Sequence, residues 1–498
     1  MTIGSYTPEE AISSIATALA PAALGIVRLS GKNCIELVSK VFSRPKALLA
    51  APGNTLVYGW IQEGGESLPL ATASELSSAT PSPRGEAPKT PKRIDEVMLA
   101  VYRAPKSFTG EDMVEIFCHG GPAVVTAIQT LMLKSGFRQA LRGEYTFRAY
   151  INGKTDLTKA EAVKEIIDSH TDAGRSHAVG RLSGSLFEEI DSIKKLIVDT
   201  LAAIEVEIEY PEDEETIADT FDRKDIELAR DRLQTLADSW KGEKLYQDGA
   251  RVVLAGRTNA GKSSLFNAIL KEERAIVSDI EGTTRDWLES WASINGIPVR
   301  LFDTAGLRET DDVIEAQGVE LSRNLASDAD LVLYLIDSTT KPTAEDEEFI
   351  KNCKEPLIVV WTKSDKVENG VLGAAPLGEG VASNEVRARG RHSPLQIQIS
   401  SKTGTGIPLL FAQIAKILTS GLTTDREQAG LGSARQRDSV AEALENVKHA
   451  LISADDNYTL DAVVQDLEEA LDCLGEVTGD VTPDDVLGSI FANFCVGK

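Results

Sequence analysis

The sequence predicts a multidomain protein of mixed α+β and α/β class, on three observations. The chain has 498 residues, more than one hydrophobic core usually supports. Residues 251–420 alternate buried-type strands with helices, whereas the flanking segments have helical periodicity. Residues 1–60 and 96–150 contain short β-rich runs. We therefore expect a β-rich N-terminal domain, and a helical domain that is interrupted by an inserted α/β domain.

The predicted boundaries follow these changes of pattern. The N-terminal domain covers residues 1–153. The helical domain is split into residues 154–248 and 424–498, and the α/β domain fills residues 249–423 between its halves.

Within the N-terminal domain, strands are indicated by runs such as Gly25–Leu29 and Glu96–Tyr102. Between them, residues 64–93 are rich in Gly, Ser, Ala, Thr and Pro and have no periodicity. Such a composition cannot build a core, so we expect a disordered insertion there.

Helical periodicity runs from about Leu157 to Trp240 and resumes after Thr424. One long helix is expected to end at Tyr210-Pro211, before the acidic residues 212–215. A metal site is one interpretation of that acidic run, but a solvated acidic face is the better one. The segment 425–498 is also acidic, with 16 Asp and Glu against 5 Lys and Arg.

The α/β domain contains continuous apolar strands, which are typical of a parallel sheet covered on both faces. Asn295-Gly296 is a hairpin signal and predicts one antiparallel edge strand. Residues 370–394 are interpreted as a second loop insertion. The predicted strands are Val252–Ala255, Val299–Phe302, Leu331–Ile336 and Leu357–Val360.

The hydropathy, cysteine content and charge of the sequence exclude several classes of protein. No apolar run reaches the roughly 18 residues of a membrane span, and no basic residue precedes Arg28 as a signal peptide would require. The 5 cysteines include no CxxC pair, which fits a reducing compartment without zinc or disulfides. We expect a cytoplasmic protein without a membrane partner. Its formal charge of −25 repels nucleic acid, so action on RNA needs a local basic surface or a partner.

Gly256–Ser263 fits GxxxxGK[ST] and directly follows an apolar strand. In such a loop Lys262 neutralises the β and γ phosphates, which is its catalytic role, and the Ser263 hydroxyl ligates Mg²⁺. The motif at 303–306 (DTAG) ends the next buried strand, where Asp303 can hold Mg²⁺ through water. Thr284 is the candidate switch threonine that completes the metal shell.

Base selection is assigned to Thr362-Lys363-Ser364-Asp365, with Asp365 accepting from guanine N1 and N2. The usual first residue of this motif is Asn, and a Thr makes fewer hydrogen bonds. These motifs predict a GTP-binding Ras-like domain. Its predicted GTP-binding residues are Asn259, Ala260, Gly261, Lys262, Ser263, Ser264, Ser278, Asp279, Ile280, Glu281, Gly282, Thr283, Thr284, Asp303, Thr304, Ala305, Gly306, Thr362, Lys363, Ser364, Asp365, Ser400, Ser401 and Lys402.

Hydrolysis of GTP also needs a group that orients water. Leu307 occupies the position where Ras-like enzymes carry Gln, and its side chain makes no hydrogen bonds. The orienting group must therefore lie elsewhere, and the segment 307–317 offers several charged side chains.

Three further motifs lie outside the α/β domain. They are Ser107–Glu115 with His119–Pro122, Gly143–Lys154, and the C-terminal Phe494–Lys498. Together with the GTP-binding motifs, they resemble the MnmE (TrmE) family of tRNA-modification GTPases over nearly the whole length of the chain. The first is similar to the family's N-terminal signature and the last to its C-terminal C-[ILV]-G-K. The second resembles another signature, although many members carry Phe at position 145.

This resemblance implies that 5-formyltetrahydrofolate, or a related one-carbon folate, is bound by Arg28, Glu115, Lys154 and Lys498. Cations suit the folate's carboxylates, and a carboxylate can accept from the pterin N–H groups. From the sequence alone, Arg28 would instead be interpreted as a surface ion-pair residue.

The resemblance further implies K⁺-dependent GTP hydrolysis, with K⁺ held by Asn259, Ser278, Ile280 and Thr283, and with Glu315 as the catalytic residue that orients water. It implies a homodimer and a heterotetramer with an FAD-dependent MnmG-type protein. With tRNA as substrate, the product would be a carboxymethylaminomethyl-type group at C5 of the wobble uridine, position 34. Cys495 matches the family's tail cysteine, and it is interpreted either as a nucleophile or as a small tail residue.

Two other functions fit part of the sequence. An Era-like assembly factor for ribosomal RNA would need a basic RNA-binding domain beside the GTP-binding domain, and the acidic C-terminal segment disfavours it. A folate-binding scaffold with a degenerate GTP-binding domain is disfavoured by the intact Lys262, Ser263 and Asp303.

Overall fold

The computed structural model describes residues 10–63, 92–209, 223–272, 288–303, 329–367, 394–420, 429–455 and 460–497. The chain divides into two compact units, residues 1–161 with 475–498 and residues 162–474. Residues 475–498 therefore group with the N-terminal sheet, although the helical pattern places them in the second part of the helical domain. Most of both predicted insertions lies outside the described residues, but Lys92 and Arg93 already belong to a strand.

The first unit contains a six-stranded mixed sheet with the order β3-β4-β5-β2-β1-β6. Neighbouring strands are antiparallel except for the short parallel pair β1 and β6. The strand bounds are β1 (Ile12–Ile15), β2 (Ala22–Ser30), β3 (Thr55–Glu63), β4 (Lys92–Tyr102), β5 (Met113–Gly120) and β6 (Arg138–Gln139).

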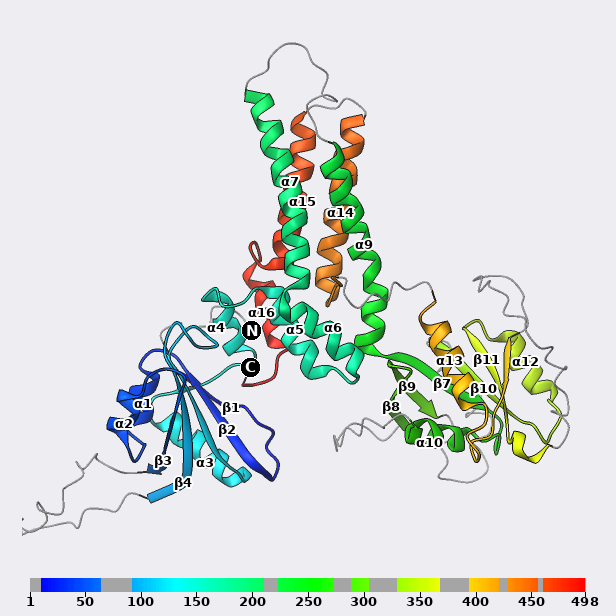
Figure 1. Ribbon diagram of the computed structural model, residues 1–498, viewed down its shortest axis with the longest axis horizontal. Coiled ribbons are helices and arrows are strands. Elements are labelled where there is room, and N and C mark those ends of the chain that lie inside the picture. The colour runs from blue at the N-terminus through cyan, green and yellow to red at the C-terminus, as the bar shows by residue number, and fades with distance from the viewer. Residues whose placement is uncertain are drawn as a thin grey trace, which may run out of the picture. The chain divides into compact units, whose positions relative to one another are not determined.

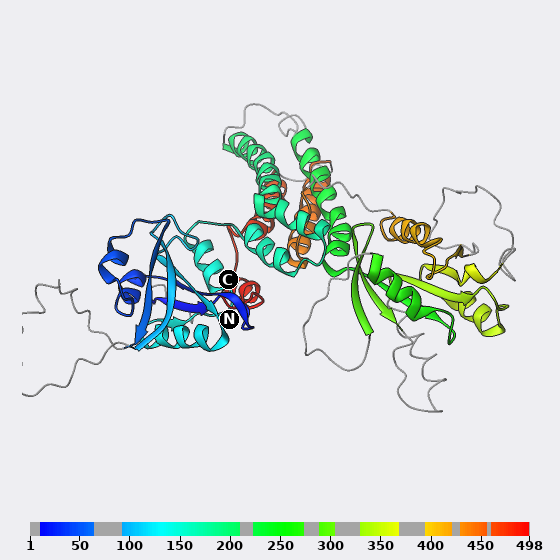
Figure 2. The same ribbon diagram turned by 60° about the horizontal axis from the view of Figure 1, so that its bottom comes forward.

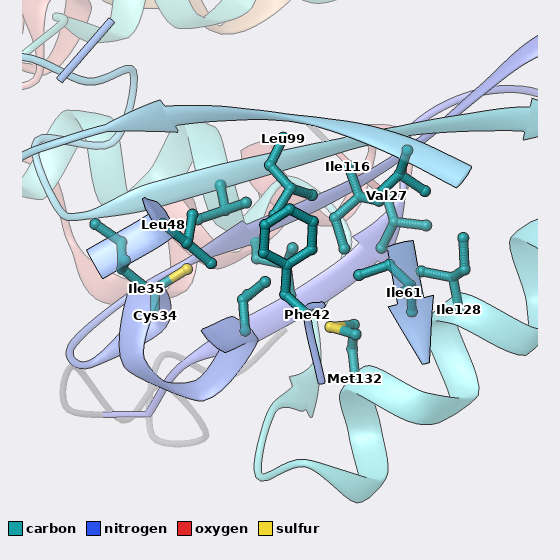
Figure 3. Close-up of a cluster of buried hydrophobic side chains, with 14 of the residues drawn as sticks. Val27, Cys34, Ile35, Phe42, Leu48, Ile61, Leu99, Ile116, Ile128 and Met132 are labelled. Atoms are coloured by element: carbon teal, nitrogen blue, oxygen red, sulfur yellow. The ribbon is translucent and has the colours of Figure 1, made fainter. Parts of the chain in front are cut away.

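Three helices, α1 (Cys34–Ser39), α2 (Pro45–Ala50) and α3 (Pro122–Lys134), cover one face of this sheet. Figure 3 shows their apolar side chains interleaved with those of the strands, around Phe42 at the centre. Alternate strand residues such as Val27 and Ile116 point into this core, as the two-residue period of a strand requires.

The C-terminal segment of the first unit packs on the motif at 143–154. Helix α4 (Glu144–Ile151) places Phe147 edge-on against Phe491 of α16 (Asp484–Ala492), with 5.3 Å between the ring centroids. Beyond α16, Val496 forms a β-bridge with Arg142. The tail is therefore held beside the N-terminal sheet.

In the second unit, helices α7, α9, α14 and α15 run side by side as a bundle (Figure 1). Helix α7 ends at Glu209, next to the predicted end at Tyr210. Helix α9 packs against α7 and α14 and leads directly into strand β7. The helix bounds are α5 (Leu157–Asp168), α6 (Asp172–Ser183), α7 (Ser185–Glu209), α9 (Arg223–Asp248), α14 (Ala434–Asp455) and α15 (Leu460–Thr478).

The inserted α/β domain is coloured from green to orange in Figure 2. Its six-stranded sheet has the order β12-β11-β10-β7-β9-β8. All pairs are parallel except β8 with β9, as predicted. Their hairpin turns at Asn295 and Gly296, both with positive φ, because the tight turn requires that conformation. Separate apolar cores lie on the two faces of the sheet.

The bounds of this domain's elements confirm the predicted strand–helix alternation. They are β7 (Ala250–Gly256), α10 (Lys262–Glu272), β8 (Leu288–Ile294), β9 (Ile297–Asp303), β10 (Leu331–Asp337), α12 (Ala344–Asn352), β11 (Leu357–Thr362), η2 (Ser364–Lys366), β12 (Leu395–Gln398) and α13 (Ile407–Leu418). Across the described part of the chain, no helix combines the length and apolarity needed to cross a bilayer.

Candidate functional site

The predicted phosphate-binding loop lies between the end of β7 and the start of α10. Gly256 has φ 134°, and a Cβ added there would lie 2.4 Å from the Leu335 carbonyl oxygen. Gly261 has φ 95°. Both positions require glycine, because a side chain would be strained at either and would clash at Gly256. The strand–loop–helix context predicted for the motif is therefore present.

Lys262 and Ser263 begin helix α10 at this loop. The Lys262 ammonium group donates to the carbonyl oxygens of Gly256 at 2.6 Å and Arg257 at 2.8 Å. The Ser263 hydroxyl donates to Asp303 Oδ2 at 3.1 Å, across from the end of β9. A hydroxyl and a carboxylate this close are the oxygen donors that Mg²⁺ prefers, so these residues fit the predicted metal.

The base-reading motif follows strand β11, and its lysine holds the phosphate loop. Lys363 has φ 56°, and its Nζ donates to the Asn259 carbonyl oxygen at 2.8 Å and to Asp337 Oδ2 at 2.5 Å. Burial alone would raise the pKa of Asp337, but the bonds from Lys363 and Thr339 lower it. Asp337 is not among the residues predicted from the sequence. It could have been found as a carboxylate at the end of a buried strand.

Asp365 and Ser400 come together as predicted for the base pocket. The Ser400 hydroxyl donates to Asp365 Oδ1 at 2.7 Å, and this bond lowers the pKa of Asp365. The carboxylate is thus kept ionised and retains Oδ2 and further lone pairs for N–H donors. Thr362 instead donates its hydroxyl to the Ala260 carbonyl oxygen at 2.7 Å.

A cavity of about 220 Å³ lies beside the same loop. Arg257, Thr258 and Asn259 line it together with Asp337 and Asp346. Asn259 and Ala260 are the predicted GTP-binding residues among its lining, whereas Lys262 and Asp365 do not contribute to it.

Several predicted site residues fall outside the described residues. They are Ser278, Asp279, Ile280, Glu281, Gly282, Thr283, Thr284, Thr304, Ala305, Gly306, Glu315 and Lys498. The K⁺ site and the catalytic glutamate therefore remain predictions from the resemblance. Of the K⁺ ligands, only Asn259 is described, in a left-handed conformation with φ 62°.

In the first unit, Arg28 and Glu115 lie on the paired strands β2 and β5. Arg28 Nε donates to Glu115 Oε1 at 2.8 Å, and its NH1 donates to the Gly497 carbonyl oxygen at 2.9 Å. The guanidinium lies 5.9 Å from the Phe108 ring centroid and 5.7 Å from that of Tyr145. Both charged side chains are mostly buried, at 20% and 14% exposure.

The segment 105–111 runs past this pair and is fixed from two sides. Lys154 Nζ donates to the Pro105 carbonyl oxygen at 3.1 Å, and the fully buried Arg148 contacts both carboxylate oxygens of Glu111 at 3.1 Å. Cation, carboxylate and aromatic ring thus meet in one place. This combination fits a flat heterocycle with carboxylates, as a folate has. Phe108 and Tyr145 lie within the two N-terminal motifs, but the sequence pattern does not predict their contact with Arg28.

Similarity to known proteins covers the whole chain. Two family models match: "GTP-binding protein TrmE N-terminus" at residues 11–154 and "MnmE helical domain" at residues 157–495. A Treponema denticola protein named tRNA modification GTPase MnmE is 48% identical over 512 residues, with 100% of both chains covered. Proteins of the same name from Treponema pallidum and Borrelia turicatae are 42% and 39% identical, with 99% of each chain covered.

Among solved structures, Era from Aquifex aeolicus bound to GDP and AlF4⁻ is 25% identical with a TM-score of 0.25, covering 40% of this chain and 66% of that one. The assignment rests on the full-length relatives and on the two family models. By that evidence, and with the nucleotide-binding geometry described above, the chain belongs to the MnmE family of tRNA modification GTPases.

Proposed function

We propose that this protein is a K⁺-stimulated GTPase that acts with an FAD-dependent MnmG-type partner. Together they would add a carboxymethylaminomethyl-type group to C5 of the wobble uridine, position 34, of certain tRNAs. A one-carbon folate in the first unit would supply carbon to that group. The observation that carries the proposal is the 48% identity to a tRNA modification GTPase over 100% of both chains.

Mass spectrometry of tRNA nucleosides tests the proposal. A strain without this protein should lack the C5-modified wobble uridine, and the unmutated gene should restore it. Lys262→Ala should fail to restore it, because the phosphates lose their cation. Lys244→Ala, a charge removal on the exterior of α9, serves as the matched control and should restore it. An unchanged nucleoside profile in the deletion strain would contradict the proposed function.

For GTP hydrolysis, the described residues act by binding and positioning. The P-loop main chain and Lys262 would hold the phosphates. Ser263 and Asp303, which lie within hydrogen-bond distance of each other, would hold Mg²⁺, and Asp365, oriented by Ser400, would select guanine. Mg²⁺ and K⁺, when bound, supply positive charge next to the phosphates, which stabilises the transition state. Glu315 is proposed to orient the attacking water.

The folate proposal is supported by the packing around Arg28. Its ion pair with Glu115 is partly buried, so a bound carboxylate would meet a desolvated cation. Arg28→Gln should abolish folate binding measured by calorimetry and leave GTP binding intact. Arg44, an exposed arginine of the same unit, provides the control variant Arg44→Gln, which should bind folate normally. Equal folate affinity in all three proteins would contradict the assignment.

The charge is distributed unevenly between the units, and this distribution supports a tRNA-binding surface on the first unit. The first unit has 18 Lys and Arg against 19 Asp and Glu, whereas the second has 34 against 58. The net charge of the second unit therefore disfavours a polyanion such as tRNA, and the first unit is close to neutral. On helix α2 and its N-cap, the exposed Lys46 and Arg44 offer cations, and Arg44 donates to the Tyr58 carbonyl oxygen.

We therefore expect tRNA to bind through the first unit. The paired change Arg44→Glu with Lys46→Glu should weaken tRNA retention on filters and flatten its salt dependence. The control pair Lys241→Glu with Lys244→Glu makes the same charge change on α9 and should have a smaller effect. The reverse order of effects would place tRNA on the second unit.

A homodimer through the first unit is supported by an exposed apolar strip on strands β3 and β4. Leu56, Tyr58 and Met98 are 59%, 52% and 43% exposed, and Tyr58 pairs with Met98 in the register. Leu56→Glu should yield monomers in analytical ultracentrifugation. Leu49→Glu, at another exposed leucine of the same unit, should leave the dimer intact. A Leu56→Glu dimer of unchanged affinity would show that the strip is not the interface.

A further inference from the structure

The last residue of strand β11 is a threonine that is fixed by the main chain around it. Thr362 is 2% exposed, and its Oγ1 donates to the Ala260 carbonyl oxygen at 2.7 Å. The Ile336 carbonyl oxygen lies 3.3 Å from the same hydroxyl. The P-loop is also in close contact, because a Cβ added to Gly261 would lie 3.4 Å from Thr362 Cβ and Oγ1.

A hydroxyl has a single proton to donate, and both neighbours of this one are carbonyls, which only accept. The proton is therefore committed to the protein's own main chain. The Thr362 hydroxyl can therefore only accept a hydrogen bond from a ligand. Guanine presents N7 as an acceptor, and two acceptors do not form a hydrogen bond. Thr362 consequently cannot read N7.

Asparagine, the usual residue at this position, differs in its number of donors. Its side-chain amide has two N–H groups and can bond a P-loop carbonyl and a base acceptor together. Thr362 retains the first of these bonds and lacks the second. The substitution thus preserves the connection between β11 and the P-loop but changes what the site can recognise.

We propose that this protein selects guanine nucleotides through their N1 and N2 edge alone and takes 7-deazaguanosine nucleotides as well as guanosine nucleotides. The inference rests on the proposed reading of that edge by Asp365, whose carboxylate is oriented by Ser400 at 2.7 Å. Thr362 is the residue that determines this specificity, through its bond to Ala260.

The test is equilibrium competition of GTP and 7-deaza-GTP against a fluorescent GDP on the full chain. The unmutated protein should bind the two nucleotides equally. Thr362→Asn should prefer GTP by roughly three- to tenfold, the worth of one neutral hydrogen bond. Thr362→Ser keeps the hydroxyl and should bind GTP and 7-deaza-GTP with equal affinity. Thr362→Val loses the bond to Ala260, so its affinity for both nucleotides should fall together.

A clear preference of the unmutated protein for GTP over 7-deaza-GTP would overturn the inference, even if Thr362→Asn fails to fold. A parallel competition with XTP tests the proposed recognition of guanine by Asp365, on which the inference rests. If the unmutated protein does not discriminate GTP from XTP, the base reading by Asp365 is wrong. If it discriminates GTP from both analogues, Asp365 reads the base and only the inference about Thr362 fails.

Discussion

Replacing Arg181 by methionine should destabilise the base of the helical bundle far more than the same replacement of Arg175 on the same helix α6. Arg181 is 2% exposed, and its guanidinium lies between two carboxylates. It donates to Glu165 Oε2 at 2.5 Å and to Glu243 Oε2 at 2.7 Å. His177 Nδ1 lies 2.8 Å from the other oxygen of Glu243.

This buried network also holds the chain where it returns from the inserted domain. A Cβ added to Gly430 would lie 2.3 Å from Glu243 Oε1, and one added to Gly432 would lie 2.1 Å from Glu165 Oε1. Because these glycines pack directly on the carboxylates, disturbance of the network reaches helices α5, α6 and α9 and the returning segment together.

The magnitude follows from burial. Methionine fills the space of the arginine stem but leaves two carboxylates without their cation, and breaking a buried ion pair in this way costs about 3–5 kcal/mol. Arg175 pairs with Asp172 at 2.6 Å, but these side chains are 53% and 88% exposed. An exposed pair contributes about 0–1 kcal/mol, so Arg175→Met should be nearly neutral.

Hydrogen exchange of the α9 amides is the suitable assay, because a chain of two units need not unfold in one step. In Arg181→Met, protection of these amides should fall by about 10²- to 10⁴-fold, as expected from the opening free energy lost. Arg175→Met should leave protection within a few fold. Similar losses in both variants, or none in Arg181→Met, would refute the assignment of this network as a stabilising one.

Three further predictions concern catalysis and pH. Glu315→Ala should lower single-turnover GTP hydrolysis in K⁺ by roughly 10²–10⁴-fold with little change in GTP affinity. The control Asp312→Ala should change the rate little. If Glu315→Ala hydrolyses GTP as fast as the unmutated protein, another group orients the water. Asn259→Ala should remove most of the advantage of K⁺ over Na⁺ in GTP turnover, and equal rates of the unmutated protein in both salts would refute the cation site. Burial alone would raise the pKa of Glu243, but His177 and Arg181 lower it. The ionised Glu243 should therefore contribute its whole stabilisation at any pH above the ordinary pKa of a glutamate carboxyl. That contribution should disappear as the pH falls through the lowered pKa of the folded state. The difference in stability between the unmutated protein and Glu243→Gln, followed by circular dichroism, should vanish at acid pH.

The α/β domain was predictable because each of its strands is a continuous apolar run between helices. The edge hairpin at Asn295-Gly296 was also predictable, since the turn chemistry is local. Phosphate and base motifs occur in a fixed order after successive strands, and parallel strands bring their carboxyl ends to one edge. Lys262, Asp303 and Asp365 could therefore be proposed from the sequence as residues of one nucleotide site.

Contacts between segments distant in the chain could not be predicted in the same way. Arg28 bonds to the Gly497 carbonyl oxygen across 469 positions of sequence, and nothing in either segment's periodicity indicates that pairing. The grouping of residues 475–498 with the N-terminal sheet has the same origin, because the boundary between the units falls inside helix α15, where the helical pattern does not change. Tertiary packing, such as that of Phe491 on Phe147, assigns this segment to the first unit.

The end of β11 shows how such distant contacts shape the nucleotide site. Two consecutive side chains, Thr362 and Lys363, bond to consecutive carbonyls of the P-loop, those of Ala260 and Asn259. Base-reading and phosphate-binding elements are thus one hydrogen-bonded unit, and Asp337 fixes the lysine from the neighbouring strand. A substitution in this motif therefore changes the P-loop as well as the base pocket. A loss of GTP affinity in a Lys363 variant cannot be attributed to the base alone, and comparison with XTP separates the two effects, because a disturbed P-loop weakens both nucleotides equally.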